Sequence, residues 1–418
     1  MTISDNTSKQ YTDNATTIVI AGGIVLALSF GVRAVFGGIV EPLSDDLFDG
    51  RIEIFSLSIA IQNLVWGLAQ PGFGMLADKY GDRLALWLGF IFYVVGMVIC
   101  TLGTTPFAQY MSAGVLVGMG ISGTAFGTVL AVVGRSAPEE KRTKYLGITS
   151  AIGSSGQFLL PLLVSWLTQW LDWRLTLIVV TGVLLPMMLC IPFLSAKPGS
   201  EIEGSNISIN QTIQNAFGHT SYVLLTAVFF VCGFHLAFIT AHFPNFVQKF
   251  CVSTSSAEEL RALGLFALSL AGLANIFGTL LASKLGSIYP KPYLLAAIYS
   301  LRAIAILIFI SLPITPVSVL IFAVFMGGIW LSTVPLTSSL ILVMFGPRAM
   351  GTLFGFVFLS HQLGSFTGVW LGGVFFDRYG SYEQIWWLSI ALSVFAAVTH
   401  LLVHEKQAPT IKLVLNNK

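Results

Sequence analysis

The chain has 418 residues, of which 55% are hydrophobic and only 10% are charged. Soluble globular domains carry about 25% charged residues, so this composition excludes a water-soluble protein and predicts a membrane protein. The net charge of +2 is too small to indicate a nucleic-acid partner. Four cysteines are too few for a disulfide framework.

The chain opens with a polar stretch, residues 1–16, which lacks the basic segment of a signal peptide. A helix that crosses a bilayer needs about 20 mostly apolar residues. The run 17–40 that follows is longer than the apolar part of a signal peptide, so we interpret it as a retained first span.

Apolar runs of similar length recur along the whole chain. They predict an all-α integral membrane protein with twelve spans, at residues 17–40, 54–77, 84–102, 106–134, 145–170, 174–195, 221–248, 259–286, 292–312, 315–345, 350–376 and 382–404. The longest polar interruption falls between the sixth and seventh spans. We therefore expect an N-terminal tail (1–16), a six-helix bundle (17–195), a linker (196–220), a second six-helix bundle (221–404) and a C-terminal tail (405–418).

The distribution of basic residues predicts the orientation. If both termini are cytoplasmic, most of the 21 Lys and Arg residues fall on the cytoplasmic side. Loops that remain in the cytoplasm are enriched in Lys and Arg. We therefore expect an inner or plasma membrane protein whose tails and linker are cytoplasmic.

A loop motif recurs in the two halves. Residues 74–83 read GMLADKYGDR, and the corresponding residues 278–287 read GTLLASKLGS. The second copy keeps the first glycine, but Ala282 stands where the first copy has Asp78. The two halves are therefore interpreted as degenerate copies in parallel orientation, a repeat pattern found in transporters that bind substrate between their halves.

The layout and this motif resemble the major facilitator superfamily. Residues 360–382, SHQLGSFTGVWLGGVFFDRYGSY, further resemble span eleven of its monocarboxylate-porter and oxalate–formate branch. The resemblance implies a monomeric transporter of two six-helix pseudo-repeats that works by alternating access. Span 259–286 departs from the porters, because it lacks their aspartate and arginine within span eight.

The resemblance also implies a gate at the cytoplasmic side. In the superfamily the aspartate of the 74–83 motif, here Asp78, helps to lock the two halves together. We assign Asp78, Arg83 and Arg135 to this gate, with Arg135 as the partner of Asp78. The alternative is that the loop serves only as a topology signal.

Arg33 and Arg302 are the basic residues that lie away from the ends of predicted spans, and no acidic residue lies near the middle of a span. Such charges are costly and face a bundle interior or an aqueous cavity. Arg33 is predicted to bind a carboxylate through its planar fork of donors. The alternative is that Arg33 extends to the surface and pairs with Glu41 or Asp45. Arg302 is predicted to be structural, bonded to backbone carbonyls or neighbouring spans.

Three histidines within spans are candidates for carrying a coupling proton, because imidazole titrates near neutral pH. They are His235, His242 and His361. The alternative for each is a hydrogen bond that packs two helices. Other polar residues fit a cavity wall, and the complete predicted substrate-binding set is Arg33, Gln62, Gln157, His235, Trp330, His361 and Gln362.

The sequence contains no zinc-protease motif, nucleophile elbow or phosphate-binding loop. It therefore predicts no enzyme activity, cofactor or metal. We expect a secondary transporter of a small organic anion, a mono- or dicarboxylate, coupled to protons or to a counter-substrate, with lipid as its surroundings. Two alternatives stay open: efflux of a larger neutral or anionic compound, and a membrane sensor or enzyme.

Overall fold

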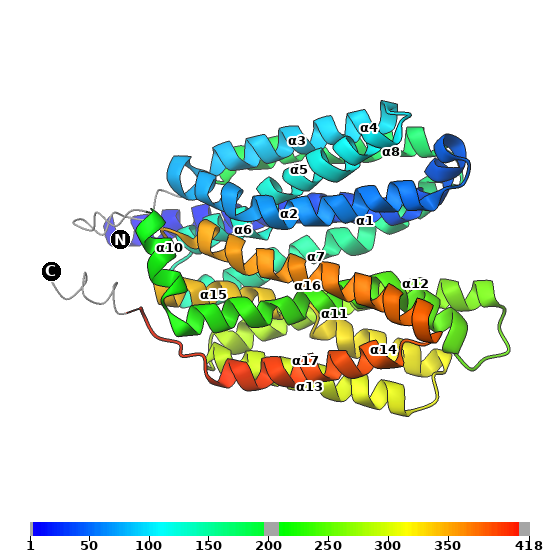
Figure 1. The fold of residues 1–418 in the computed structure, drawn as a ribbon. Coiled ribbons are helices and arrows are strands. Elements are labelled where there is room, and N and C mark those ends of the chain that lie inside the picture. Colours follow the sequence, from blue (N-terminus) through cyan, green and yellow to red (C-terminus); the bar gives the residue numbers. More distant parts are fainter. Residues whose placement is uncertain (1–2, 196–208, 409–418) are drawn as a thin grey trace.

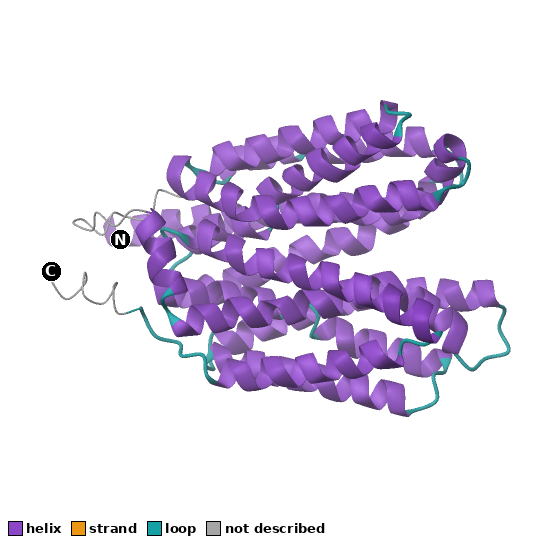
Figure 2. Cartoon of the chain, viewed as in Figure 1, coloured by secondary structure: helices purple, strands orange, loops and turns teal. Residues whose placement is uncertain are grey.

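The computed structural model describes residues 3–195 and 209–408. All regular structure within these residues is helical (Figure 2). The helices form one elongated bundle, and α1 begins at the same end at which α17 finishes (Figure 1). We call this end the terminal side and the other end the distal side. Parts of the predicted tails and linker, residues 1–2, 196–208 and 409–418, lie outside the described residues.

The first half of the chain builds the bundle drawn in blue to green at the top of Figure 1. Its elements are α1 (Ile3–Phe48), α2 (Ile52–Tyr80), α3 (Asp82–Leu102), α4 (Pro106–Gln109), the π-helical η1 (Tyr110–Leu116), α5 (Val117–Thr124), α6 (Phe126–Ser136), the short η2 (Glu139–Lys141), α7 (Arg142–Leu167), α8 (Trp173–Leu184), α9 (Met187–Cys190) and η3 (Ile191–Phe193). Helix α1 begins within the predicted tail, well before the expected start of the first span.

The second half, drawn in green to red below, follows the same plan (Figure 1). Its elements are α10 (Ile209–Phe217), α11 (Thr220–Phe250), α12 (Ala257–Gly286), α13 (Lys291–Ser311), α14 (Pro316–Gly328), α15 (Thr333–Phe345), α16 (Met350–Tyr379) and α17 (Glu383–Leu401). The short α10 lies within the predicted linker.

Ten helical stretches of the described residues are long and apolar enough to cross a membrane. Helices α2 and α16 are also of spanning length, 29 and 30 residues, and carry polar side chains such as Gln62 and His361. Adding these two completes the predicted order of twelve spans. Some spans are interrupted, and the tenth is divided into α14 and α15.

The two halves contact each other through α2 against α16 and through α7 against α12. Glycine permits their close approach: a Cβ on Gly74 would lie 2.2 Å from the carbonyl oxygen of Gly351, and one on Gly147 1.8 Å from Ser283 Oγ. Nearer the distal side of α12, a Cβ on Gly272 would lie 4.0 Å from its nearest neighbour, Phe158. The halves are therefore tightly packed at the terminal side and diverge toward the distal side.

Gly74→Val should prevent the terminal side from closing. The added Cβ overlaps backbone atoms of α16, which cannot turn aside as the tip of a side chain can. Spin-label distances between the terminal ends of α2 and α16 should lengthen in this variant. Gly373→Val on α16 is the control, because a Cβ there meets nothing within 4 Å. Equal distances in Gly74→Val and wild type would contradict the interpretation.

Candidate functional site

Arg33 lies on α1 where this helix faces α2. Its Nη2 donates a hydrogen bond to Asn63 Oδ1 at 2.6 Å, and its guanidinium lies 5.0 Å from the centre of the Trp66 ring. Its Nε is buried and has no hydrogen-bond partner. Among the ion pairs of the described residues none includes Arg33, so the predicted alternative of pairing with Glu41 or Asp45 is not what the structure contains.

Asn63 orients this arginine, and the sequence reasoning missed it. Its Nδ2 donates to the carbonyl of Ile59 at 2.9 Å, which leaves its Oδ1 directed at Arg33. Its own carbonyl accepts a hydrogen bond at 3.2 Å from Gln362 Nε2, across the boundary between the halves. The one feature of the sequence that could have pointed to Asn63 was its position next to the predicted Gln62.

Gln62 itself bonds within the first half and not to the Arg33 site. Its side chain is fully buried and donates to the carbonyl of Ala113 at 2.8 Å. Gln70, two turns further along α2, likewise donates to the carbonyl of Ser122 in α5. These two glutamines therefore join helices within one half.

Aromatic rings continue from Arg33 to His361. The Trp66 ring lies 4.8 Å from that of Phe358 and 5.8 Å from that of Phe30. His361 stacks on Phe358 at 4.9 Å and its Nδ1 contacts Gln362 Oε1 at 3.3 Å. The structure thus brings Arg33, His361 and Gln362 together around Asn63 and Trp66. We call these five residues the Arg33 site.

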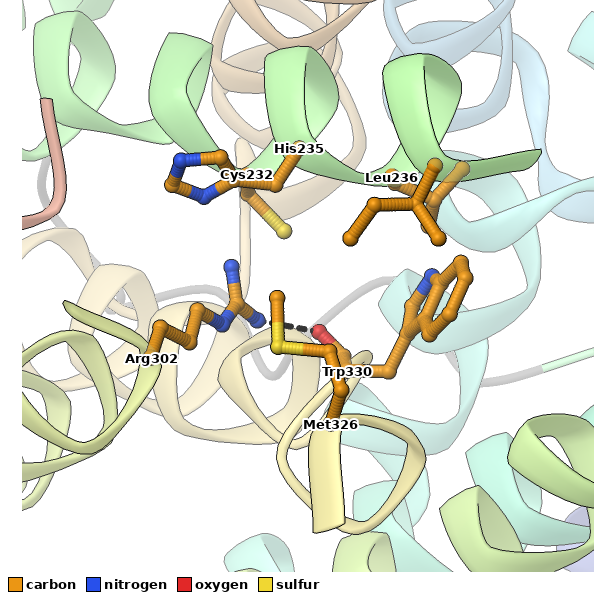
Figure 3. Close-up of a pocket in the computed structure, with 7 residues that line it drawn as sticks. Cys232, His235, Leu236, Arg302, Met326 and Trp330 are labelled. Carbon is orange, nitrogen blue, oxygen red and sulfur yellow. Dashed lines mark hydrogen bonds between the residues drawn. The ribbon is translucent and has the colours of Figure 1, made fainter. Parts of the chain in front are cut away.

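The contacts of the Arg33 site do not include the other predicted residues, His235, Trp330, Gln157 and His242. His235 and Trp330 line a small cavity with Arg302 inside the second half (Figure 3). Gln157 is half-buried on α7, one residue after Gly156, which contacts α1. His242 contacts the carbonyl of Val369 through Nε2 at 2.9 Å. The predicted single site is therefore divided.

Arg302 has the contacts predicted for it. Its Nη2 donates to the carbonyl of Ile329 at 2.7 Å and to that of Trp330. These carbonyls belong to the break between α14 and α15, where the helical hydrogen-bond ladder ends. Asn275 Oδ1 accepts from the N–H of Leu331 in the same break, at 2.9 Å. Arg302 therefore donates hydrogen bonds to carbonyls at the point where the tenth span is interrupted.

Asp78 connects the halves at the terminal side. Its Oδ2 accepts hydrogen bonds from the N–H and the hydroxyl of Thr352, both at 2.7 Å, and its Oδ1 accepts from the N–H of Gly351 at 3.2 Å. These are among the first residues of α16, where N–H groups lack partners within the helix and the helix dipole is positive. Asp78 of one half thus caps a helix of the other.

Arg135, the partner expected for Asp78, donates to it from Nη1 at 2.7 Å. Its Nη2 pairs with Asp82, a residue that was not predicted. Arg83 does not join this cluster in the structure. It lies on α3 and donates to the carbonyl of Pro192, within η3 of the same half, at 2.6 Å.

Helices α7 and α15 form another hydrogen bond between the halves at the terminal side. The hydroxyls of Thr143 on α7 and Ser339 on α15 are 2.7 Å apart, and Ser154 accepts from Asn275 at 2.8 Å further in. Among the described residues, hydrogen bonds between the halves lie at the level of Asn63 or nearer the terminal side. The Arg33 site therefore lies at the level where hydrogen bonding between the halves ends, among the described residues.

Comparisons with known proteins agree with this architecture. The sequence profile of the Major Facilitator Superfamily matches residues 22–369 and 257–414. Monocarboxylate transporter 13 of Bos taurus is 24% identical, with 87% of this chain and 83% of that protein aligned. The aspyridones efflux protein apdF of Emericella nidulans is 24% identical, with 91% of this chain and 76% of that protein aligned.

Among solved structures, the fucose:proton symporter FucP of E. coli superposes with a TM-score of 0.67. The two sequences are 14% identical, and the aligned region covers 92% of this chain and 99% of the symporter chain, so the two share a fold. The two-half architecture of the structure agrees with the family that the matched profile indicates. This chain belongs to the Major Facilitator Superfamily of membrane transporters and is not an enzyme.

Proposed function

We propose that this transporter carries a small organic anion, a mono- or dicarboxylate, and binds it at Arg33. One observation carries the proposal: the guanidinium of Arg33 has an amide and an aromatic ring as partners, and no carboxylate of the described residues pairs with it. An unpaired charge at membrane depth is costly, and a carboxylate substrate would remove that cost when bound.

The position of Arg33 suits such a substrate. Asn63 occupies one guanidinium nitrogen, and the buried Nε has no partner. Trp66 and Phe358 supply apolar surface beside it, and Gln362 adds an amide from the other half. A substrate held by groups from both halves is affected directly when the halves move, as alternating access requires.

The gate around Asp78 supports the same cycle. If the protein lies in an inner or plasma membrane with both termini on the cytoplasmic side, the packed terminal side would be a closed cytoplasmic gate. The distal side, where the halves diverge, would be the extracellular entrance. Asp78 and Arg135 would then stabilise the outward-facing state and separate when the transporter turns inward.

Transport would be proton-coupled or an exchange. Of the three candidate histidines, His361 is the one at the Arg33 site, and its Nε2 is buried without a hydrogen-bond partner. His235 and His242 are bonded to backbone carbonyls away from Arg33. We therefore assign His361 first place as the residue that would carry the coupling proton.

A second candidate is efflux of a larger neutral or anionic compound. The aromatic rings of Phe30, Trp66 and Phe358 beside Arg33 favour this reading, because they offer more apolar surface than a small carboxylate covers. One relative is named as an efflux protein.

The test is a ligand screen on purified protein, followed by uptake into proteoliposomes. A ligand at 100 times its dissociation constant stabilises the folded protein by about 2.7 kcal/mol. We expect small carboxylates to raise the melting temperature and to be taken up. If sugars and cationic drugs stabilise the protein and carboxylates do not, the proposal is wrong. Stabilisation by bulky apolar compounds only would favour efflux.

A further inference from the structure

The second half contains a buried positive charge that the proposed substrate site does not use. Arg302 is 1% exposed, and the described residues provide no carboxylate that pairs with it. Its Nη2 donates to two carbonyls at the end of α14, and its guanidinium lies 4.9 Å from the Tyr299 ring centre. A helix C-terminus carries about half a negative charge, so these contacts compensate only part of the guanidinium.

The guanidinium of Arg302 also faces a cavity. Arg302 and His235 lie on opposite walls of a space of about 10 Å³, which is about the room that one water molecule occupies. In Figure 3 a second guanidinium nitrogen points toward Cys232 and His235, away from the hydrogen bond to Trp330. The Nε of Arg302 and the Nδ1 of His235 are both buried without partners. Buried polar atoms usually have a partner, so a group held in the cavity would find two nitrogens open to hydrogen bonding.

The tautomer of His235 limits what that ligand is. Its Nε2 lies 3.0 Å from the carbonyl oxygen of Ser389, and a carbonyl only accepts, so Nε2 carries a proton. In neutral imidazole the other nitrogen, Nδ1, is then an acceptor. An anion in the cavity needs donors on both sides, so it requires a proton on Nδ1 as well.

We propose that the cavity between Arg302 and His235 binds one monovalent inorganic anion of the size of chloride, together with a proton taken by His235. The pair adds no net charge to the membrane interior, where a lone ion would be expensive. The cavity is too small for a carboxylate with a carbon chain. The site uses a different arginine from the Arg33 site, although His361 of the Arg33 site interacts with Cys232 at the cavity wall. The proposal holds whatever the transported substrate is.

Other titratable groups around the cluster are accounted for. Cys232 of α11, Tyr299 of α13, His361 of α16 and His400 of α17 interact electrostatically with Arg302 or with each other. Cys232 Sγ lies 3.4 Å from Thr333 Oγ1. A Cys232 thiolate is the rival counter-charge to an external anion, and the experiment separates the two.

The experiment measures the melting temperature of purified protein in gluconate buffer while chloride or bromide is added. We expect a saturable rise of several degrees, since a ligand at 100 times its dissociation constant shifts the folding equilibrium about 100-fold. The rise should be larger at pH 6 than at pH 8. Arg302→Gln should lose it, and Arg33→Gln should keep it.

Two further variants distinguish the mechanism. His235→Gln offers an amide donor that does not titrate, so the halide effect should persist and lose its pH dependence. Cys232→Ala should leave the halide effect unchanged. A halide effect seen only in Cys232→Ala would assign the counter-charge to the thiolate and overturn the proposal.

Crystals grown in bromide decide the case if Arg302→Gln does not fold. An anomalous peak between Arg302 and His235 in the wild-type protein supports the proposal. A water molecule there, or melting temperatures that do not respond to halide, overturns it. So does a halide effect that survives in Arg302→Gln.

Discussion

Arg33→Gln should abolish uptake of the organic anion while the protein still inserts and folds. Removing one partner of a buried hydrogen-bonded charge pair costs about 2–5 kcal/mol, which corresponds to at least about 25-fold in affinity. Glutamine keeps hydrogen-bonding capacity toward Asn63, so the helix contact survives while the charge is lost. The measurement is uptake per correctly inserted molecule, together with the melting-temperature shift caused by the substrate.

Arg174→Gln is the matched control. Arg174 is another arginine of the first half, but it is exposed and paired with Asp46 at 2.7 Å. An exposed ion pair contributes about 0–1 kcal/mol, so this variant should transport as the wild type does. Equal transport by wild type and Arg33→Gln would remove Arg33 from the substrate site.

Asp78→Asn should slow turnover about 10- to 100-fold with little change in substrate affinity. Asp78 accepts three hydrogen bonds from Gly351 and Thr352, and a hydrogen bond to a charged group contributes about 1.5–3 kcal/mol. Asparagine keeps one acceptor oxygen, loses the charge that complements the α16 N-terminus and presents an amide to N–H groups. The state closed at the terminal side therefore loses population relative to the open state.

The population shift is measured by distances between labels on the terminal ends of α2 and α16, with substrate binding measured in parallel. Asp46→Asn is the control, because Asp46 pairs with Arg174 within one half. Its conformational populations should match those of the wild type. Loss of binding affinity in Asp78→Asn, with unchanged distances, would argue against a gate.

The order of the spans could be read from the sequence because membrane insertion is a local constraint. Every stretch that crosses the bilayer must be apolar over its own length, so its composition reveals it wherever it packs. Helices α2 and α16 are instructive, since they have the length of a span and yet carry polar side chains near its middle. Their polar residues are tolerated because many of them face other helices, as Gln62 faces η1.

The same locality made Arg33, Arg302 and Asp78 visible. A charge inside an apolar run, or an acid in a short loop with a recognisable motif, stands out without knowledge of its neighbours. The pair of Asp78 with Arg135 was anticipated from the resemblance to the Major Facilitator Superfamily, and the bonding of Arg302 to backbone carbonyls was anticipated from its charge inside an apolar run.

What a polar residue contacts depends on how helices are rotated against one another, and only the tertiary structure decided that. Gln62 and Asn63 are adjacent in sequence, yet a rotation of about 100° per residue sends one to η1 and the other to Arg33. Likewise His235 and His361 are both buried imidazoles, but His235 faces Arg302 and His361 stacks at the Arg33 site. The sequence determined that this chain is a twelve-span transporter with unpaired arginines, and helix packing determined which side chains surround each of them.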